Sequence, residues 1–318
     1  MNSSPDLPPD HDTRWERDLL RRFSFEVLRE QRRARRWGIF FKFLLMGYLL
    51  AVVGLSWQSA QGPSHLGKDR VTGLVDVKGI IAEGAPASAD NVIKGLRAAF
   101  EDEATVGVIL RINSPGGSPV QAGYINDEIA RLRTKYPNKK LFAVIQDICA
   151  SGGYYVAAAA EEIHADKASL VGSIGVRMDS FGFVEALDKL GVERRLLTAG
   201  EHKGFLDPFL PLQAEEVQHV SGLLAEIHAQ FMDTVKKGRG KRLKDDPRLF
   251  SGYVWTGARA VELGLVDGLA SAGSVARERF KAEDIVDFTP REGVVDALAR
   301  RFGTATLQRV REWAQTPW

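Results

Sequence analysis

Short apolar runs alternate with amphipathic segments along most of the chain. Runs typical of buried strands occupy residues 71–81, 106–112, 141–145, 163–165, 170–176 and 195–197. Apolar residues recur at helical spacing in 90–100, 122–132, 183–190, 213–237, 256–263 and 294–313. Strands that alternate with helices at this spacing predict an α/β domain with a largely parallel sheet and right-handed crossovers.

For two of the predicted helices, the sequence also predicts the N-cap or the buried face. Asp90 stands where an N-cap is expected for the helix over 90–100. The long helix over 213–237 is expected to turn one apolar face to the core, made of Val217, Val220, Leu224, Ile227, Phe231 and Val235.

Residues 37–57 form the most apolar stretch and carry Lys42 as their one charge. As a helix, 21 residues would span about 30 Å, the thickness of the hydrocarbon core of a membrane. Trp37 and Trp57 at the two ends are typical of membrane interfaces, and the arginines of the preceding segment indicate a cytoplasmic N-terminus. The pattern favours an uncleaved anchor over a cleaved signal peptide, whose apolar core would be shorter.

The anchor divides the chain into five predicted segments. These are a basic tail over 1–36, the anchor over 37–57, a linker over 58–70, a globular domain over 71–290 and an amphipathic helix over 291–318. This topology places the domain on the extracytoplasmic side of the cytoplasmic membrane.

The amino-acid composition excludes few classes of function. The 318 residues are 44% hydrophobic and 26% charged, as in ordinary globular proteins, and a net charge of +2 does not indicate a nucleic-acid partner. Cys149 is the one cysteine, so the chain can form no internal disulfide.

Ser151 lies on a predicted strand-to-helix turn. It follows the apolar run 141–145 and precedes Gly152, Gly153 and a run rich in alanine. A hydroxyl in this place is close to unpaired backbone N–H groups, which can stabilise an oxyanion in acyl transfer. The structural alternative is that Ser151 merely caps the helix.

A second turn carries the sequence Asn-Ser-Pro-Gly-Gly over 113–117, again between a predicted strand and a predicted helix. Glycines allow a backbone N–H to point outward at a ligand oxygen. The nucleotide-binding patterns G-x-x-x-x-G-K-[ST] and G-x-G-x-x-G are missing, so a phosphate site is disfavoured, and no sequence motif typical of metal ligands is present.

A nucleophilic serine needs a proton acceptor at neutral pH. The candidate bases are His164, His202, His219, His228 and Lys203. His219 and His228, on opposite edges of a long helix, are expected to be solvated. Lys203 could act only if burial and neighbouring groups lowered its pKa from about 10.4 by several units.

Four ordered motifs together resemble the signal peptide peptidase A family of serine peptidases, in its short form. They are Asn-Ser-Pro-Gly-Gly over 113–117, Ala-Ser-Gly-Gly-Tyr-Tyr over 150–155, Val-Gly-Ser-Ile-Gly-Val over 171–176 and Thr-Ala-Gly-Glu-His-Lys over 198–203. The resemblance covers about 71–270. It implies the fold of the Clp protease and crotonase superfamily, with repeated β-β-α units.

The resemblance also implies a role for each matching residue. Ser151 would be the nucleophile, Lys203 the general base and Ser173 the residue that orients the lysine amine. Gly117 and Gly152 would donate the N–H groups of the oxyanion hole. A Ser-Lys dyad needs neither cofactor nor metal.

The chain holds one copy of the catalytic domain, whereas long-form relatives hold two. The resemblance therefore implies a ring-like homo-oligomer that builds its sites within or between identical subunits. It also implies remnant signal peptides and other membrane-associated peptides as substrates.

The alternatives are a Clp-type Ser-His peptidase, an acyl-coenzyme A enzyme of the crotonase type and an inactive membrane-tethered scaffold. Cys149, two residues before Ser151, is interpreted as a small buried apolar residue rather than a nucleophile.

Overall fold

The computed structural model describes residues 33, 35–51, 54 and 69–290. The chain divides into two compact units, of which one comprises Pro63–Arg291 and holds the sheet and the elements around it. In the other unit, residues 35–51 are helical and exposed. Among the described residues, no helix combines the length and the apolar character that a membrane crossing requires. The predicted anchor over 37–57 lies partly outside the described residues, and the predicted helix over 294–313 lies wholly outside them.

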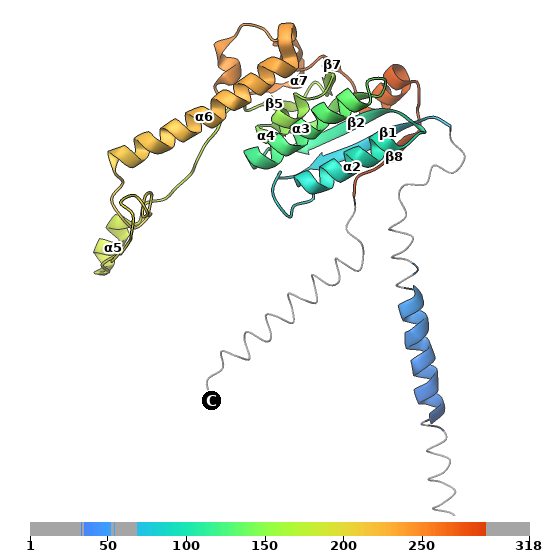
Figure 1. The fold of residues 1–318 in the computed structure, drawn as a ribbon, viewed down its shortest axis with the longest axis horizontal. Coiled ribbons are helices and arrows are strands. Elements are labelled where there is room, and N and C mark those ends of the chain that lie inside the picture. The colour runs from blue at the N-terminus through green and yellow to red at the C-terminus, as the bar shows by residue number, and fades with distance from the viewer. Residues whose placement is uncertain (1–32, 34, 52–53, 55–68, 291–318) are drawn as a thin grey trace, which may run out of the picture. The chain divides into compact units, whose positions relative to one another are not determined.

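The larger unit is a mixed α/β structure built on one sheet (Figure 1). Its main strand order is β6-β5-β3-β2-β1-β8, and β4 and β7 join it beside β3. Every pairing is parallel except that of β5 with β6, so the prediction of a largely parallel sheet is confirmed. The strands are β1 (Val71–Lys78), β2 (Thr105–Ser114), β3 (Lys140–Ala150), β4 (Glu162–Ala165), β5 (Leu170–Gly172), β6 (Val254–Thr256), β7 (Gly268–Leu269) and β8 (Ile285–Asp287).

Helices occupy the connections between these strands. They are α2 (Ala89–Glu101), α3 (Pro119–Lys135), α4 (Gly152–Ala157), α5 (Val184–Leu190), α6 (Ala214–Arg239), α7 (Gly257–Glu262) and α8 (Ala272–Ser274), with the shorter turns η1 (Gly240–Arg242), η2 (Pro247–Phe250) and η3 (Val275–Phe280). Ser88 caps α2 by accepting the N–H of Asn91, so the predicted cap at Asp90 is wrong. Ser and Asp are both favoured at N-caps, and the helix begins two residues earlier than the apolar periodicity predicted.

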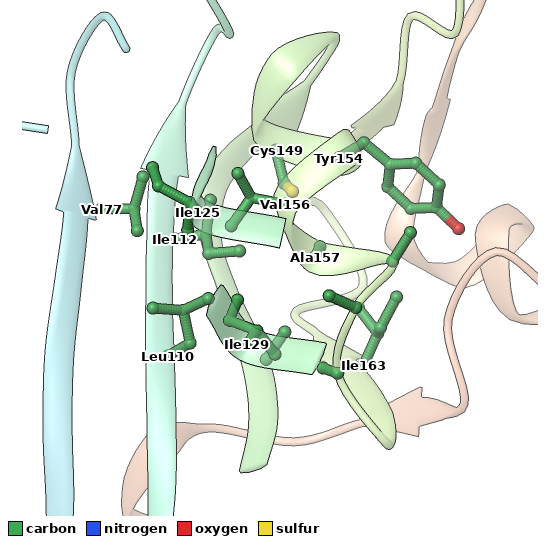
Figure 2. Close-up of a cluster of buried hydrophobic side chains, with 14 of the residues drawn as sticks. Val77, Leu110, Ile112, Ile125, Ile129, Cys149, Tyr154, Val156, Ala157 and Ile163 are labelled. Atoms are coloured by element: carbon green, nitrogen blue, oxygen red, sulfur yellow. The ribbon is translucent and has the colours of Figure 1, made fainter. Parts of the chain in front are cut away.

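The main core lies between the sheet and the helices that cover it. Figure 2 shows side chains from β1, β2, α3 and α4 packed together around Ile112 and Val156. Tyr154 is fully buried there, and its hydroxyl donates to the Leu265 carbonyl at 2.7 Å. A smaller cluster includes Phe142 and Phe280, whose rings stack at 4.9 Å.

Strand β3 changes partner along its length. Its first half pairs with β4 from Phe142 to Val144, and its second half pairs with β5 from Ile148 to Ala150. The register with β2 shifts in the same region, between Ile112 and Ser114. Such an irregularity bends a strand and re-aims its end, and here that end leads directly into Ser151.

Helix α6 packs on the core with its C-terminal half only. Phe231 and Val235 are buried, and Gly238 comes so close to α4 that a Cβ there would lie 2.0 Å from the Ala158 oxygen. Val217 in the other half is 43% exposed, so the prediction of one continuous core face is wrong for this half. Figure 1 shows α6 extending away from the sheet, with α5 at its far end.

Residues 177–224, called the arm below, comprise α5, the N-terminal part of α6 and the segments between them. The strand predicted over 195–197 is not formed: these residues have no regular secondary structure. A short apolar run becomes a strand only where another strand pairs with it, and within the described residues none lies beside this one. The strand predicted over 170–176 ends early, at Gly172.

Candidate functional site

Ser151 joins β3 to α4 with a backbone conformation that only glycine adopts easily. Its φ is 51° and its ψ is −124°. Its N–H donates to the Gly172 carbonyl at 2.9 Å, and its own carbonyl accepts the N–H of Tyr155 at 3.0 Å. The side chain makes no capping hydrogen bond, which removes the interpretation of Ser151 as an N-cap. The hydroxyl is therefore not engaged by the helix that it precedes.

The glycine loop lies directly against Ser151. A Cβ built on Gly116 would lie 2.8 Å from both the Ser151 Cβ and the Gly152 nitrogen, and one built on Gly117 would lie 2.1 Å from the Ile81 oxygen. Their φ values of 103° and 151° are also ones that side chains disfavour. Both positions therefore require glycine, for space as well as for backbone conformation.

Two backbone N–H groups meet beside the Ser151 hydroxyl. A Cβ on Gly152 would lie 3.3 Å from the Gly117 nitrogen, so the two loops are in contact there. Among the described residues, neither Gly117 nor Gly152 donates its N–H to another backbone group. The structure thus brings Ser151, Gly117 and Gly152 together with two donors free for a ligand oxygen, the arrangement that an oxyanion hole requires.

Ser173 lies next to this group. It follows Gly172, which accepts the Ser151 N–H, and its own N–H donates to the Tyr253 carbonyl at 2.7 Å. Like Ser151 it has a positive φ, here 52°. Ser173 is partly exposed.

Lys203 is not brought to Ser151 within one chain. It lies in a turn of the arm, where its N–H donates to the Gly200 carbonyl at 3.1 Å, and it is exposed. Figure 1 shows α5 and the neighbouring part of the arm at the end of α6 that points away from the sheet. The single chain therefore brings together the predicted nucleophile and the predicted N–H donors, with the predicted base elsewhere.

The histidines do not supply a base in its place. His164 is 5% exposed on β4, its Nε2 lies 3.0 Å from Glu162 Oε2, and burial lowers its pKa. The strand holding it pairs with β3 at Val144, well before Ser151. Among the hydrogen bonds described, none joins Ser151 to a histidine.

The remaining histidines differ from one another. His202 is exposed in the same turn as Lys203, and the ring of His219 contacts Phe205 within the arm. His228 is half-buried with its Nε2 3.3 Å from the Ile174 oxygen, so the expectation that it is solvated is wrong. It ties α6 to the segment that follows Ser173.

Cys149 is fully buried, and burial raises the pKa of its thiol. Its interpretation as a small apolar residue is confirmed. In the part of the chain that the structure describes, no group of three or more histidine, cysteine, aspartate or glutamate side chains could hold a metal ion.

The sequence did not reveal what holds the glycine loop in place. Ile81 pairs with Gly117 through an isolated bridge, in which the Ile81 N–H donates to the Gly116 oxygen and the Ile81 oxygen accepts from Ser118. On the inner side, Ser114 accepts the Gly116 N–H at 3.1 Å. The one signal in the sequence was that the apolar run after residue 71 extends as far as Ile81.

Comparison with known proteins places these motifs in a family. The pattern of peptidase family S49 matches residues 133–285, which include Ser151, Ser173 and Lys203. A Na⁺/H⁺ antiporter NhaA of Brucella abortus is 49% identical over 185 residues, which are 58% of this chain and 25% of that protein. The chain therefore matches only a quarter of that relative's length.

Two further relatives match over more of their own length. A putative protease of Synechocystis is 32% identical over 62% of this chain and 69% of its own. A putative signal peptide peptidase SppA of Enterococcus faecium is 28% identical over 75% of this chain and 71% of its own. From these matches and from the family pattern over the Ser151 turn, the chain belongs to peptidase family S49.

Proposed function

We propose that this protein is a serine endopeptidase in which Ser151 is the nucleophile and Lys203 the general base. The observation that carries the proposal is the strained Ser151 turn, with its free hydroxyl beside the Gly117 and Gly152 N–H groups. Membership of peptidase family S49 supports the same chemistry. The fold would then be that of the Clp protease and crotonase superfamily, which the split pairing of β3 fits.

The reaction follows from these groups. The neutral amine of Lys203 accepts the proton of Ser151 as its oxygen attacks the peptide carbonyl. The negative charge that develops on that oxygen is stabilised by the N–H groups of Gly117 and Gly152. The lysine ammonium then protonates the leaving amine, and water hydrolyses the acyl-enzyme by the same steps. Ser173 would accept a hydrogen bond from the ammonium and orient it.

We further propose that Lys203 serves the Ser151 of a neighbouring copy. The arm exposes large apolar side chains, with exposed fractions of 77% for Phe181, 74% for Leu190 and 95% for Leu197. It also contains a cavity of about 250 Å³ lined by apolar residues such as Phe181 and Leu212. Apolar surface on this scale is typical of an interface. Packing against another copy would also take Lys203 out of solvent, as a lysine base requires.

The proposed substrates are cleaved signal peptides and other membrane-associated peptides. The Enterococcus relative is named a putative signal peptide peptidase, and the apolar segment over 37–57 would hold the enzyme at the cytoplasmic membrane with its catalytic domain on the extracytoplasmic side. An anchor of this kind would keep the site close to peptides that remain in the bilayer.

The test is hydrolysis of a fluorogenic peptide with apolar and small residues by the full chain in detergent. We expect Ser151→Ala and Lys203→Ala to lower kcat by at least about 10³-fold, while His164→Ala and His202→Ala stay active. His202→Ala is the matched control for Lys203→Ala, because the two residues are neighbours in one exposed turn. Full activity of Lys203→Ala with loss in a histidine variant would replace the dyad by a Ser-His mechanism.

A further inference from the structure

Ser114 is buried beside the site and does not line it. It ends β2, it is 0% exposed, and it pairs with Cys149 just past the shift in register between β2 and β3. Its Oγ accepts the N–H of Gly116 at 3.1 Å. A Cβ on Gly153 would lie 3.0 Å from the Ser114 oxygen, so Ser114 also contacts the start of α4. Ser114 therefore contacts both loops that meet at the oxyanion hole, Gly116 through its hydroxyl and Gly153 most closely through its backbone oxygen.

The backbone of Gly116 is held on both sides. Its N–H donates to Ser114 Oγ, and its carbonyl accepts the N–H of Ile81 at 2.9 Å. The Gly116 carbonyl and the Gly117 N–H belong to the same planar peptide group, so their directions are opposite and linked. Fixing Gly116 therefore fixes where the Gly117 N–H points.

The hydrogen bond from Ser114 matters because, apart from the Ile81 bridge, the sequence of the loop itself restrains it little. Two consecutive glycines have wide conformational freedom, and the preceding Pro115 has no N–H to donate. Burial strengthens the bond, since an unpaired N–H in this place would have no water to replace Ser114. We propose that Ser114 is a positioning residue, whose hydroxyl holds Gly116 so that the Gly117 N–H points at the developing oxyanion.

The inference rests on the proposed peptidase function, in which the Gly117 N–H stabilises the transition state. An N–H that points away from the oxyanion weakens binding of the transition state and leaves substrate binding in place. We therefore expect Ser114→Ala to lower kcat about tenfold, with KM within about twofold of the wild type. Affinity for a peptide aldehyde, whose adduct with Ser151 carries the same oxyanion, should fall by a similar factor.

Ser114→Cys separates the hydrogen bond from packing. The thiol nearly keeps the volume of the hydroxymethyl group and is a poor acceptor, so we expect it to lose kcat as Ser114→Ala does. Ser88→Ala is the matched control, because Ser88 is also buried and accepts one backbone N–H, that of Asn91, away from Ser151. It should lose some stability and keep the wild-type kcat.

The experiment measures kcat, KM, aldehyde affinity and thermal unfolding on the same preparations of the full chain. Wild-type kcat in Ser114→Cys would overturn the inference, as would an equal loss of kcat in Ser88→Ala. If the wild type showed no hydrolysis that Ser151→Ala abolishes, the proposed function itself would fail. The two failures are therefore distinguishable.

Discussion

Ser151 is held in a conformation that costs the folded state free energy. A side chain at φ 51° and ψ −124° is strained by about 1–3 kcal/mol, and such strain persists only where the surroundings enforce it. Here the hydrogen bonds from Ser151 to Gly172 and from Tyr155 to Ser151 fix the turn from both sides. The result is a serine that does not cap its helix and whose Cβ lies against the glycine loop.

Replacing Ser151 with glycine should therefore stabilise the protein while removing its activity. Relief of strain exceeds the added entropy of glycine in the unfolded chain, so we expect Ser151→Gly to be more stable than Ser151→Ala by about 1 kcal/mol in chemical denaturation. Ser118→Gly is the matched control, because Ser118 has an ordinary φ of −60°. Glycine relieves no strain there, so we expect this variant to be less stable than the wild type by about 0.3 kcal/mol. A Ser151→Gly variant less stable than Ser151→Ala would contradict the strain.

At the scale of single residues, part of the site was predictable from the sequence. A serine followed by two glycines after an apolar run points to Ser151 and Gly152, because strand-to-helix turns have few solutions. The support from Ser114 and Ile81 was not predictable. It depends on which backbone atoms the folded loop brings within 3 Å of each other, and no local pattern in the sequence records that.

Between elements, Glu128 joins two helices that cover the sheet. It lies on α3 and is bound by Arg131 of the same helix, at 2.6 and 2.8 Å, and by Arg97 of α2, at 2.7 Å. The hydrogen bond from Arg131 is the main cause that lowers the pKa of Glu128 to about 2, against a smaller opposing effect of burial and with further help from Arg97. The carboxylate is thus a charged link between α2 and α3.

This link should make stability depend on pH. Because the pKa of Glu128 is lower in the folded state than the usual 4.5, its contribution is complete above about pH 4.5 and is lost as the pH falls toward 2. We expect Glu128→Gln to be less stable by about 1–2 kcal/mol at pH 7, a figure reduced because both arginines are half-exposed.

Chemical denaturation of Glu128→Gln and wild type between pH 7 and pH 2.5 would measure this difference. Asp127→Asn is the matched control, since Asp127 is the exposed neighbour on the same helix. The difference for Glu128→Gln should shrink below pH 4.5. A difference that stays constant to pH 2.5 would show that the ionised carboxylate does not carry it.

Strands β1 to β5 and the longer helices were predictable, because each buries an apolar run or a regular apolar pattern. Strands β6, β7 and β8 were not predicted, because two or three residues are too few to show such a pattern. Residues 195–197 and the N-terminal half of α6 differ from the prediction. A run such as Arg195–Leu197 forms a strand only beside a partner, and Val217 is buried only if something covers it. Periodicity shows which face is apolar and does not show what packs against it.

At the scale of the whole molecule, the arm separates the predicted base from the nucleophile. Lys203 is exposed in the arm, and Ser151 lies at the end of β3, so one chain alone does not form the dyad. The same arm carries apolar side chains, such as Leu197 and Phe181, that the chain itself leaves exposed. Both facts are explained together if the arm of one copy packs on the next copy and delivers Lys203 there.

Mixed oligomers test this arrangement directly. In our proposal, an oligomer made only of Ser151→Ala subunits is inactive, and so is one made only of Lys203→Ala subunits. Together, a Lys203→Ala subunit supplies Ser151 and its Ser151→Ala neighbour supplies Lys203. Random assembly of equal amounts places such a pair at about one quarter of all sites, and at a larger share once pure assemblies are removed, so at least about one quarter of the wild-type activity should return. A dyad within one chain would return none, because no subunit then holds both groups.

The two variants would be co-expressed with different affinity tags and purified through both tags in turn, so that only mixed assemblies are assayed. The matched control pairs Ser151→Ala with the double variant Ser151→Ala/Lys203→Ala, which assembles in the same way and contains no nucleophile. Activity in the first mixture and none in the second assigns Lys203 to the neighbouring copy. Mixed assemblies that form and stay inactive would place the dyad within one chain, and the arm would then have to fold back toward its own Ser151.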